Sequence, residues 1–218
     1  MLAGTLPQQV AELLRERILS GVYAPGARIV EAELAGELDV SRNTLRSALQ
    51  MLTFEGLLVQ NQFKSTHVPL PRSEDVFETY TLRNALEAMA CRLAAERASA
   101  FGTADLDATV NRMRAASKAE DRAAMVAADY DFHVAVVDLA GHALLREHYR
   151  LLQARTRLYL NLTASVDYVL PRIEKLHRDL AAAIRRGEVE QAERLGGSHN
   201  TPDGEHLCKI LRKQEATA

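Results

Sequence analysis

Tryptophan is absent from this sequence, and aromatic residues of all kinds make up only 5% of its 218 residues. A large aromatic binding surface is therefore not expected. The sequence has only two cysteines, Cys91 and Cys208, which are isolated and form no CxxC pair. This pattern argues against a disulfide framework and is typical of a protein kept in a reducing cytoplasm.

Long apolar segments are also missing. The N-terminus has no basic start followed by a long apolar run, as a secretory signal would have. No window of about 20 apolar residues, the length that spans a bilayer, occurs in the chain. We therefore expect a soluble, cytoplasmic protein with no membrane partner.

The sequence has no basic excess, because its formal net charge is −2. A nucleic-acid-binding surface would therefore have to come from local clustering of cationic side chains. One such cluster lies between residues 41 and 68, where Arg42, Arg46 and Lys64 outnumber the single acidic residue, Glu55. The charge pattern alone gives only weak support for DNA binding.

The length of the chain accommodates two modest domains. The segment Pro69-Leu70-Pro71 cannot continue a helix, since proline lacks a backbone N–H and restricts the residue before it. Beyond it Ala, Leu, Arg and Glu dominate, and these residues favour helices. We predict a first domain at 1–68, a linker at 69–73 and a second domain at 74–218.

The first domain has the pattern of three helices followed by a hairpin. Apolar residues recur at a helical period from Gln8 to Leu19, and a second short helix is predicted from Glu31 to Leu38. Ser41 is a good N-cap for a third helix, which Gly56 ends. Short apolar segments at 57–59 and 67–68 predict a two-stranded hairpin. This order is that of a winged helix-turn-helix, whose third helix lies in the DNA major groove.

The start of the third helix offers the residue types that read DNA. Arginine pairs with guanine or clamps a phosphate, while Asn, Thr and Ser make shorter contacts. An ordinary solvated helix start explains the same residues equally well when they are considered alone. The candidate DNA-binding residues are Arg42, Asn43, Thr44, Arg46 and Ser47 on the helix and Lys64 in the hairpin.

The second domain is predicted to be an all-α bundle of about six to seven helices. Helical periodicity is nearly unbroken there, and glycine and proline residues mark the breaks. The predicted helices lie at about 74–100, 103–118, 120–140, 143–166, 169–186, 188–198 and 204–213.

Four polar residues of this domain lie on otherwise apolar helical faces. Asp129 and His133 are four residues apart and share one face of a helix. His177 and His199 lie on the apolar faces of two later helices. Three imidazoles and one carboxylate suit a divalent transition metal such as zinc, nickel or manganese. Each histidine taken alone is better explained as a hydrogen-bonded core residue, and the case for a metal depends on all four residues meeting.

Ordered motifs in both halves resemble a known family. Val40-Ser41-Arg42-Asn43-Thr44-Leu45-Arg46, preceded by Glu33-Leu34-Ala35 and followed by Glu55-Gly56-Leu57, resembles the signature of GntR transcription regulators over residues 8–68. Asp129-Tyr130-Asp131-Phe132-His133 resembles the D-x-x-F-H motif of the FadR-type (FCD) effector domain, over residues 74–200. The resemblance implies operator contacts from Arg42, Thr44 and Arg46.

The same resemblance implies a metal site and an effector. The implied ligands are Asp129, His133, His177 and His199, although His206 is an alternative last ligand if the segment before it is an insertion. A small carboxylate or hydroxy acid would fill open metal positions. Arg83 would pair with that anion, unless it pairs with Glu87 four residues on. Arg157 and Asn161 share a helix face and are further effector-binding candidates.

The sequence therefore predicts a regulator, with a repressor as the commoner type, whose affinity for a double-stranded DNA operator is controlled by a small acid at the metal site. A homodimer would present two reading heads to a pseudo-palindromic operator. Two alternatives remain. One is a metal-dependent hydrolase that uses the Asp and His cluster to activate water. The other is a regulator with a purely structural metal.

Overall fold

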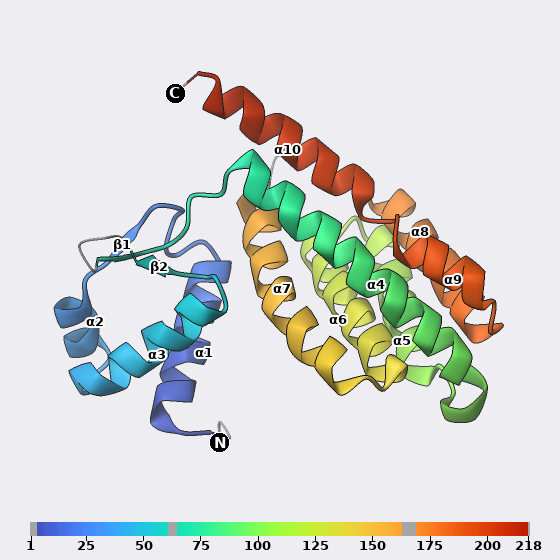
Figure 1. The fold of residues 1–218 in the computed structure, drawn as a ribbon, viewed down its shortest axis with the longest axis horizontal. Coiled ribbons are helices and arrows are strands. Elements are labelled where there is room, and N and C mark those ends of the chain that lie inside the picture. The colour runs from blue at the N-terminus through green and yellow to red at the C-terminus, as the bar shows by residue number, and fades with distance from the viewer. Residues whose placement is uncertain (1–3, 61–64, 163–168, 218) are drawn as a thin grey trace. The chain divides into compact units, whose positions relative to one another are not determined.

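The computed structural model describes residues 4–60, 65–162 and 169–217, with the side chains of 160–162 outside this description. The fold is mainly helical with one small antiparallel sheet, as the sequence predicted (Figure 1). The chain divides into two compact units, and the break between them falls after Val76. The second half of α7, from Leu151, and the end of α10, from Leu211, are grouped with the first unit. The division into domains at residues 69–73 remains a prediction.

The first unit contains the predicted winged helix. Its helices are α1 (Leu6–Leu19), α2 (Glu31–Glu37) and α3 (Arg42–Phe54), and its strands are β1 (Arg28–Ile29), β2 (Val59–Gln60) and β3 (Thr66–His67). Leu45, Leu49 and Leu52 of α3 are buried, as the helical period predicted. The C-terminal residues of α3 lead to Gly56, whose φ of +75° lies in the left-handed region that glycine adopts without strain.

Two helix starts in this unit show how the local sequence sets the structure. The Ser41 side chain accepts a hydrogen bond from the Thr44 backbone N–H at 3.1 Å, which confirms the predicted N-cap of α3. α1 begins two residues earlier than predicted, because Thr5 and Gln8 form a capping box around its first turn. Pro7 fits there, since the first-turn N–H groups have no helical partner.

The predicted hairpin is present as the antiparallel pair of β2 and β3, and a third strand, β1, joins it. The wing is a three-stranded antiparallel sheet in the order β1-β3-β2, in which Arg28 and Val59 both pair with His67. The extra strand, β1, is only two residues long, and of these only Ile29 is buried. Two residues are too few to show a strand period, so the sequence pattern gave no sign of this strand.

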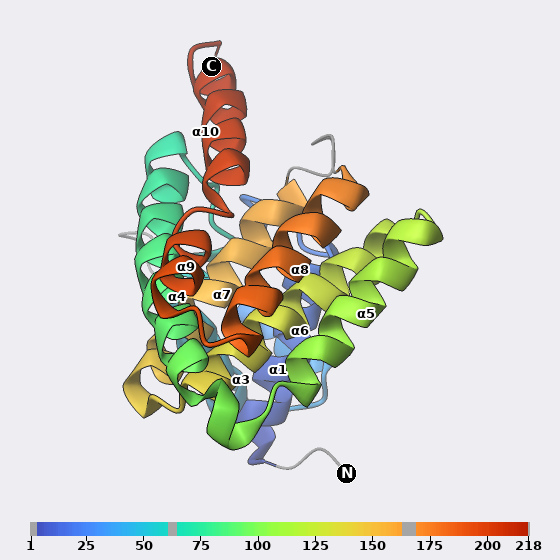
Figure 2. The ribbon, with the colours of Figure 1, turned by 90° about the vertical axis from the view of Figure 1, so that its right-hand side faces the viewer.

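The remaining helices form a bundle. They are α4 (Ser73–Phe101), α5 (Ala104–Lys118), α6 (Arg122–Ala140), α7 (Ala143–Leu162), α8 (Leu170–Arg185), α9 (Val189–Gly196) and α10 (Thr201–Glu215). α10 begins three residues before the predicted position, because Pro202 lies in its first turn, where proline is tolerated. In Figure 2, α8 lies between α9 and α5, and it contacts both.

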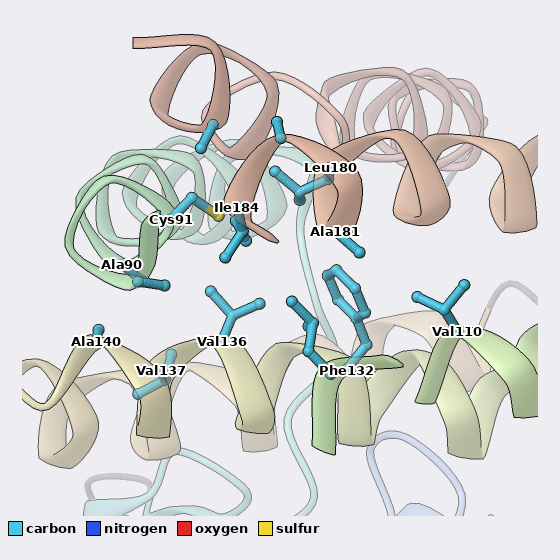
Figure 3. Close-up of a cluster of buried hydrophobic side chains, with 14 of the residues drawn as sticks. Ala90, Cys91, Val110, Phe132, Val136, Val137, Ala140, Leu180, Ala181 and Ile184 are labelled. Atoms are coloured by element: carbon cyan, nitrogen blue, oxygen red, sulfur yellow. The ribbon is translucent and has the colours of Figure 1, made fainter. Parts of the chain in front are cut away.

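The core of the bundle is apolar and rich in small side chains. Figure 3 shows Ala90 and Cys91 of α4 facing Val136 and Val137 of α6, with Ile184 of α8 on the same cluster. Small residues let the helices approach closely, and the larger Phe132 fills the space nearest the polar residues described below. Within the described residues, no helix combines the length and the apolar character needed to cross a bilayer.

Candidate functional site

Three buried histidines meet in the interior of the second unit. His133 comes from α6, His177 from α8 and His199 from the turn between α9 and α10, and one nitrogen of each lies within 4.8 Å of the others. The Nε2 atom of His133 is 3.3 Å from Nε2 of His177 and 3.5 Å from Nε2 of His199. Nitrogens about 2.0–2.1 Å from a tetrahedral zinc ion lie about 3.3–3.4 Å apart, so these spacings fit a metal site.

The outer nitrogens of two of these rings are held by the backbone. His177 Nδ1 lies 2.8 Å from the carbonyl oxygen of Ile173, and His199 Nδ1 lies 3.0 Å from that of Gly196. Because a carbonyl oxygen only accepts, each Nδ1 must donate a proton. This leaves Nε2 as the nitrogen through which each ring could bind a metal once that nitrogen carries no proton.

Asp129 lies on the same helical face as His133, beside two of the three histidines. Its Oδ1 atom lies 3.0 Å from His177 Nε2 and 3.9 Å from His133 Nε2. Burial disfavours the charged form of His177, but attraction to and hydrogen bonding with the Asp129 carboxylate outweigh this and raise the pKa of His177. Burial also opposes ionisation of Asp129, yet the nearby histidines lower its pKa overall. A carboxylate beside three imidazoles is a donor set that suits a divalent transition metal.

The other two histidines are held in the neutral form. Burial lowers the pKa of His199 to about 4. Burial, followed by repulsion from the Arg83 guanidinium, lowers the pKa of His133 well below its ordinary value. Neutral imidazoles are the form that binds metal, so the environment prepares both rings for coordination.

Glu87 of α4 links the site to its surroundings, a role that the sequence did not reveal. Its Oε1 accepts hydrogen bonds from Arg83 Nε at 2.6 Å and from the Tyr149 hydroxyl at 2.5 Å. Its Oε2 accepts from Asn200 Nδ2 at 2.8 Å and lies 3.3 Å from His133 Nδ1. Burial alone would raise the pKa of Glu87. Attraction to Arg83 and the hydrogen bond from Tyr149 lower it by more, so the pKa is lowered overall and the carboxylate stays ionised.

The buried pair of Arg83 and Glu87 is the intrahelical pairing that the sequence offered as the alternative for Arg83. Arg83 is only 5% exposed, and the assignment of an effector to it remains a prediction. Arg157 is exposed on α7, and the side chain of Asn161 lies outside the described residues. Their roles as effector-binding residues also remain predictions.

The structure brings His199 to the other histidines, whereas His206 is exposed on α10. Gly196 explains how this happens. A Cβ atom at residue 196 would lie 2.5 Å from the Cys91 sulfur and 2.9 Å from the Glu87 carbonyl oxygen. Only glycine therefore lets the end of α9 approach α4 so closely, and His199 follows three residues later.

The predicted DNA-reading residues lie at the start of α3. Arg42, Asn43 and Arg46 are exposed, and Thr44 and Ser47 are partly exposed. Arg46 Nε donates to Glu31 Oε2 at 2.8 Å, although the arginine side chain stays 62% exposed. Lys64, the candidate in the wing, lies outside the described residues.

Comparison with known proteins agrees with both halves of the structure. Residues 6–68 match the family model described as "Bacterial regulatory proteins, gntR family", and residues 78–201 match the FCD domain. One relative, from Paenarthrobacter nicotinovorans, is described as "Probable D-xylose utilization operon transcriptional repressor". It is 30% identical over 87% of this chain and 83% of its own length. The galactonate operon transcriptional repressor of Escherichia coli is 26% identical over 83% of this chain and 87% of its own length.

Solved structures share the fold. A GntR chain from Rhodococcus sp. RHA1 matches with a TM-score of 0.79 and 24% identity, covering 92% of this chain and 96% of that one. E. coli McbR/YncC matches with a TM-score of 0.77 and 22% identity, covering 97% and 99%. The family and its named relatives are transcription regulators, not enzymes, which removes the hydrolase alternative. The chain belongs to the GntR family of DNA-binding transcription regulators and carries a C-terminal FCD domain.

Proposed function

We propose that this regulator is a repressor whose affinity for its operator is controlled by a small organic acid bound at a metal site. The metal ligands would be Asp129, His133, His177 and His199, and the metal zinc, nickel or manganese. The observation that carries the proposal is the convergence of three imidazole Nε2 atoms, two of which belong to rings held at Nδ1 by backbone carbonyls. Zinc prefers a tetrahedral set of nitrogen and oxygen donors, while nickel and manganese accept six ligands.

The acid would join the metal in positions that the protein leaves open. A metal with four protein ligands and octahedral geometry retains two such positions, which a carboxylate or a hydroxy acid fills. Arg83 would add a charge-assisted hydrogen bond to the same anion if its pair with Glu87 loosens. The description of one relative as the galactonate operon repressor supports a small acid as the effector class.

The DNA-binding half would act in a homodimer. Two winged helices would present the starts of their α3 helices to two half-sites, through Arg42, Asn43, Thr44, Arg46 and Ser47, with Lys64 contributing from the wing. In this proposal residues 1–68 form the DNA-binding domain, 69–73 the linker and 74–218 the effector domain.

α4 carries Arg83 and Glu87 and begins at Ser73, where the linker ends. An acid that changes how these side chains pair therefore acts on the helix that leads directly to the linker.

Thermodynamic linkage limits how the acid can act on DNA binding. The acid changes the affinity for the operator only if it binds one DNA-affinity state better than the other, and the operator then changes the affinity for the acid by the same factor. A repressor that releases its operator must bind the acid better when it is free of DNA.

The metal is tested by elemental analysis of protein purified without a chelator. We expect about one transition-metal ion per chain in the wild type and in His206→Ala, because His206 is exposed. His177→Ala and His199→Ala should lose most of the metal. Full metal content in the His177→Ala protein would refute the site.

The response is tested by a gel shift on DNA from the region upstream of the protein's own gene, with and without a panel of small carboxylates. We expect a specific shift that an acid weakens in the metal-loaded wild type, and no acid effect in His177→Ala. Loss of the shift in Arg42→Ala would place the contact on α3. If the metal is bound but no acid changes the affinity for the operator, the metal is structural.

A further inference from the structure

A second set of polar groups lies on α4 and in the first turn of α10, and two of its atoms have no partner in the described part of the chain. Within the described residues, the hydroxyl of Tyr80 and the side-chain oxygen of Asn84 are buried and make no hydrogen bond. The two residues lie four positions apart on α4, next to Arg83 and one to two turns before Glu87. Buried polar atoms are nearly always satisfied, so two unpaired ones on one helical face need an explanation.

The ring of Tyr80 is fixed in place. A Cβ atom at residue 204 would lie 2.7 Å from the Tyr80 ring, so Gly204 of α10 is what allows the ring to pack against that helix. The guanidinium carbon of Arg83 lies 6.0 Å from the ring centroid. Tyr80 is only 4% exposed. The packing against α10 holds the buried ring, and with it the hydroxyl, in place.

Burial and nearby charges act on this hydroxyl. After burial, the groups that most affect the pKa of Tyr80 are Arg83, Asp203 and Asp129, and burial together with the two carboxylates raises it. The hydroxyl lies close enough to these groups, which include the candidate metal ligand Asp129, for their charges to affect its pKa. It therefore stays protonated and can donate a hydrogen bond.

Asp203 adds an acceptor to the same region. It lies in the first turn of α10 and is partly exposed. Burial and the charge of Asp129 raise the pKa of Asp203, although the Arg172 charge opposes this. A carboxylate there favours a neutral hydroxyl and repels a second carboxylate. Together, Tyr80, Asn84 and Asp203 offer one donor and several acceptors, which is the pattern that alcohol groups satisfy.

We propose that Tyr80, with Asn84 and Asp203, selects the effector as a polyhydroxy monocarboxylic acid by hydrogen bonding to hydroxyls beyond its second carbon. This inference rests on the proposed function, because the metal and Arg83 would take the carboxylate end. Buried polar groups that hydrogen-bond only to a ligand hydroxyl stay unpaired when the ligand has no such hydroxyl. A site of this kind therefore discriminates strongly against an analogue that lacks the hydroxyl.

The test uses ligands that differ only in the remote hydroxyls. Threonate and erythronate share their carboxylate, 2-hydroxyl and four-carbon chain with 2-hydroxybutyrate, which has no further hydroxyl. Calorimetric titration of the metal-loaded wild type should show at least one trihydroxy acid binding about tenfold more tightly than 2-hydroxybutyrate. In Tyr80→Phe this preference should shrink to about threefold or less, while the Kd of 2-hydroxybutyrate stays unchanged.

Tyr149→Phe is the matched control, because it removes a hydroxyl that already has a partner, Glu87. It should change the Kd of both kinds of acid by the same factor and lower the melting temperature. Tyr80→Phe should keep its metal and melt at the same or a higher temperature, since the hydroxyl it loses is unpaired.

The outcomes separate this inference from the proposed function. If the wild type binds both kinds of acid equally, or if Tyr80→Phe weakens the binding of both equally, the role of Tyr80 is overturned and the proposed metal-and-acid site is not affected. Failure of the metal-loaded protein to bind any of these acids would count against the proposed metal-and-acid site as well.

Discussion

The Oε2 atom of Glu87 lies 3.3 Å from Nδ1 of His133, and both side chains are almost completely buried. This contact joins α4 to the histidine cluster on α6 through the ring nitrogen that does not face the other two histidines. A carboxylate on the outer nitrogen of a metal-binding histidine fixes the tautomer and makes the ring a stronger ligand. The same carboxylate also holds Arg83, so one residue connects the candidate metal site to the candidate effector-binding arginine.

Glu87→Gln should weaken metal binding by about 10- to 100-fold, the usual cost of losing an outer-shell carboxylate. The amide keeps the shape of the side chain but loses the charge that orients His133 and neutralises Arg83. Competition with a chromophoric chelator measures the change. Glu188→Gln is the control, because Glu188 pairs with Arg186 on the surface. An unchanged metal affinity in Glu87→Gln would mean that the contact with His133 is incidental.

Gly196→Ala should destabilise the bundle by about 1–3 kcal/mol and lower its metal content, because the new methyl group overlaps Cys91 and the backbone of α4. Gly36→Ala provides the comparison, since residue 36 lies in α2 with nothing within 4 Å of the added Cβ. That substitution should be neutral or stabilising by about 0.5–1 kcal/mol. Thermal unfolding with metal analysis distinguishes them. Equal stability of the two variants would show that α9 can move away from α4 at no cost.

The parts of the structure that the sequence predicted are those set by neighbours in the chain. Ser41 caps α3 through a residue three positions away, and Asp129 and His133 share a face because they are four apart. The motif resemblance supplied His177 and His199, which helical period alone would not have brought together.

The parts that it missed depend on distant residues or on very short elements. Besides its bond from the nearby Arg83, Glu87 receives hydrogen bonds from Tyr149 and Asn200, which are 62 and 113 residues away. Gly196 and Gly197 look like a simple helix break in the sequence, yet Gly196 is required by close packing against Cys91. β1 has two residues, so it shows no period. In each case the deciding contact is made only in the folded chain.

Glu31→Gln should strengthen operator binding by up to about fivefold, because an exposed ion pair contributes about 0.2–1 kcal/mol. In the free protein Arg46 donates to Glu31, and this pair competes with any phosphate or base for the guanidinium. Fluorescence anisotropy with operator DNA at two salt concentrations measures the effect. Glu37→Gln serves as the control, because its partner is Arg17 on α1. If Glu31→Gln binds the operator more weakly, Glu31 positions Arg46 for DNA binding and does not compete with DNA for it.

Metal affinity should rise with pH, and His177 should set the steep part of the curve. Asp129 raises the pKa of His177 in the metal-free protein, so the ring carries a proton that the metal must displace. His133 and His199 have lowered pKa values and release no proton at neutral pH. Below the raised pKa of His177, affinity should therefore fall by about tenfold for each pH unit, the slope of one displaced proton.

The proton is counted by calorimetric titration of zinc or cobalt in buffers with different heats of ionisation, between about pH 5.5 and 7.5. Asp129→Asn removes both a ligand and the charge that holds the proton, so it should bind metal more weakly and with a flatter pH dependence. His206→Ala leaves this interaction intact and should follow the wild-type curve. A pH dependence as steep in Asp129→Asn as in the wild type would show that the displaced proton belongs to a group other than His177.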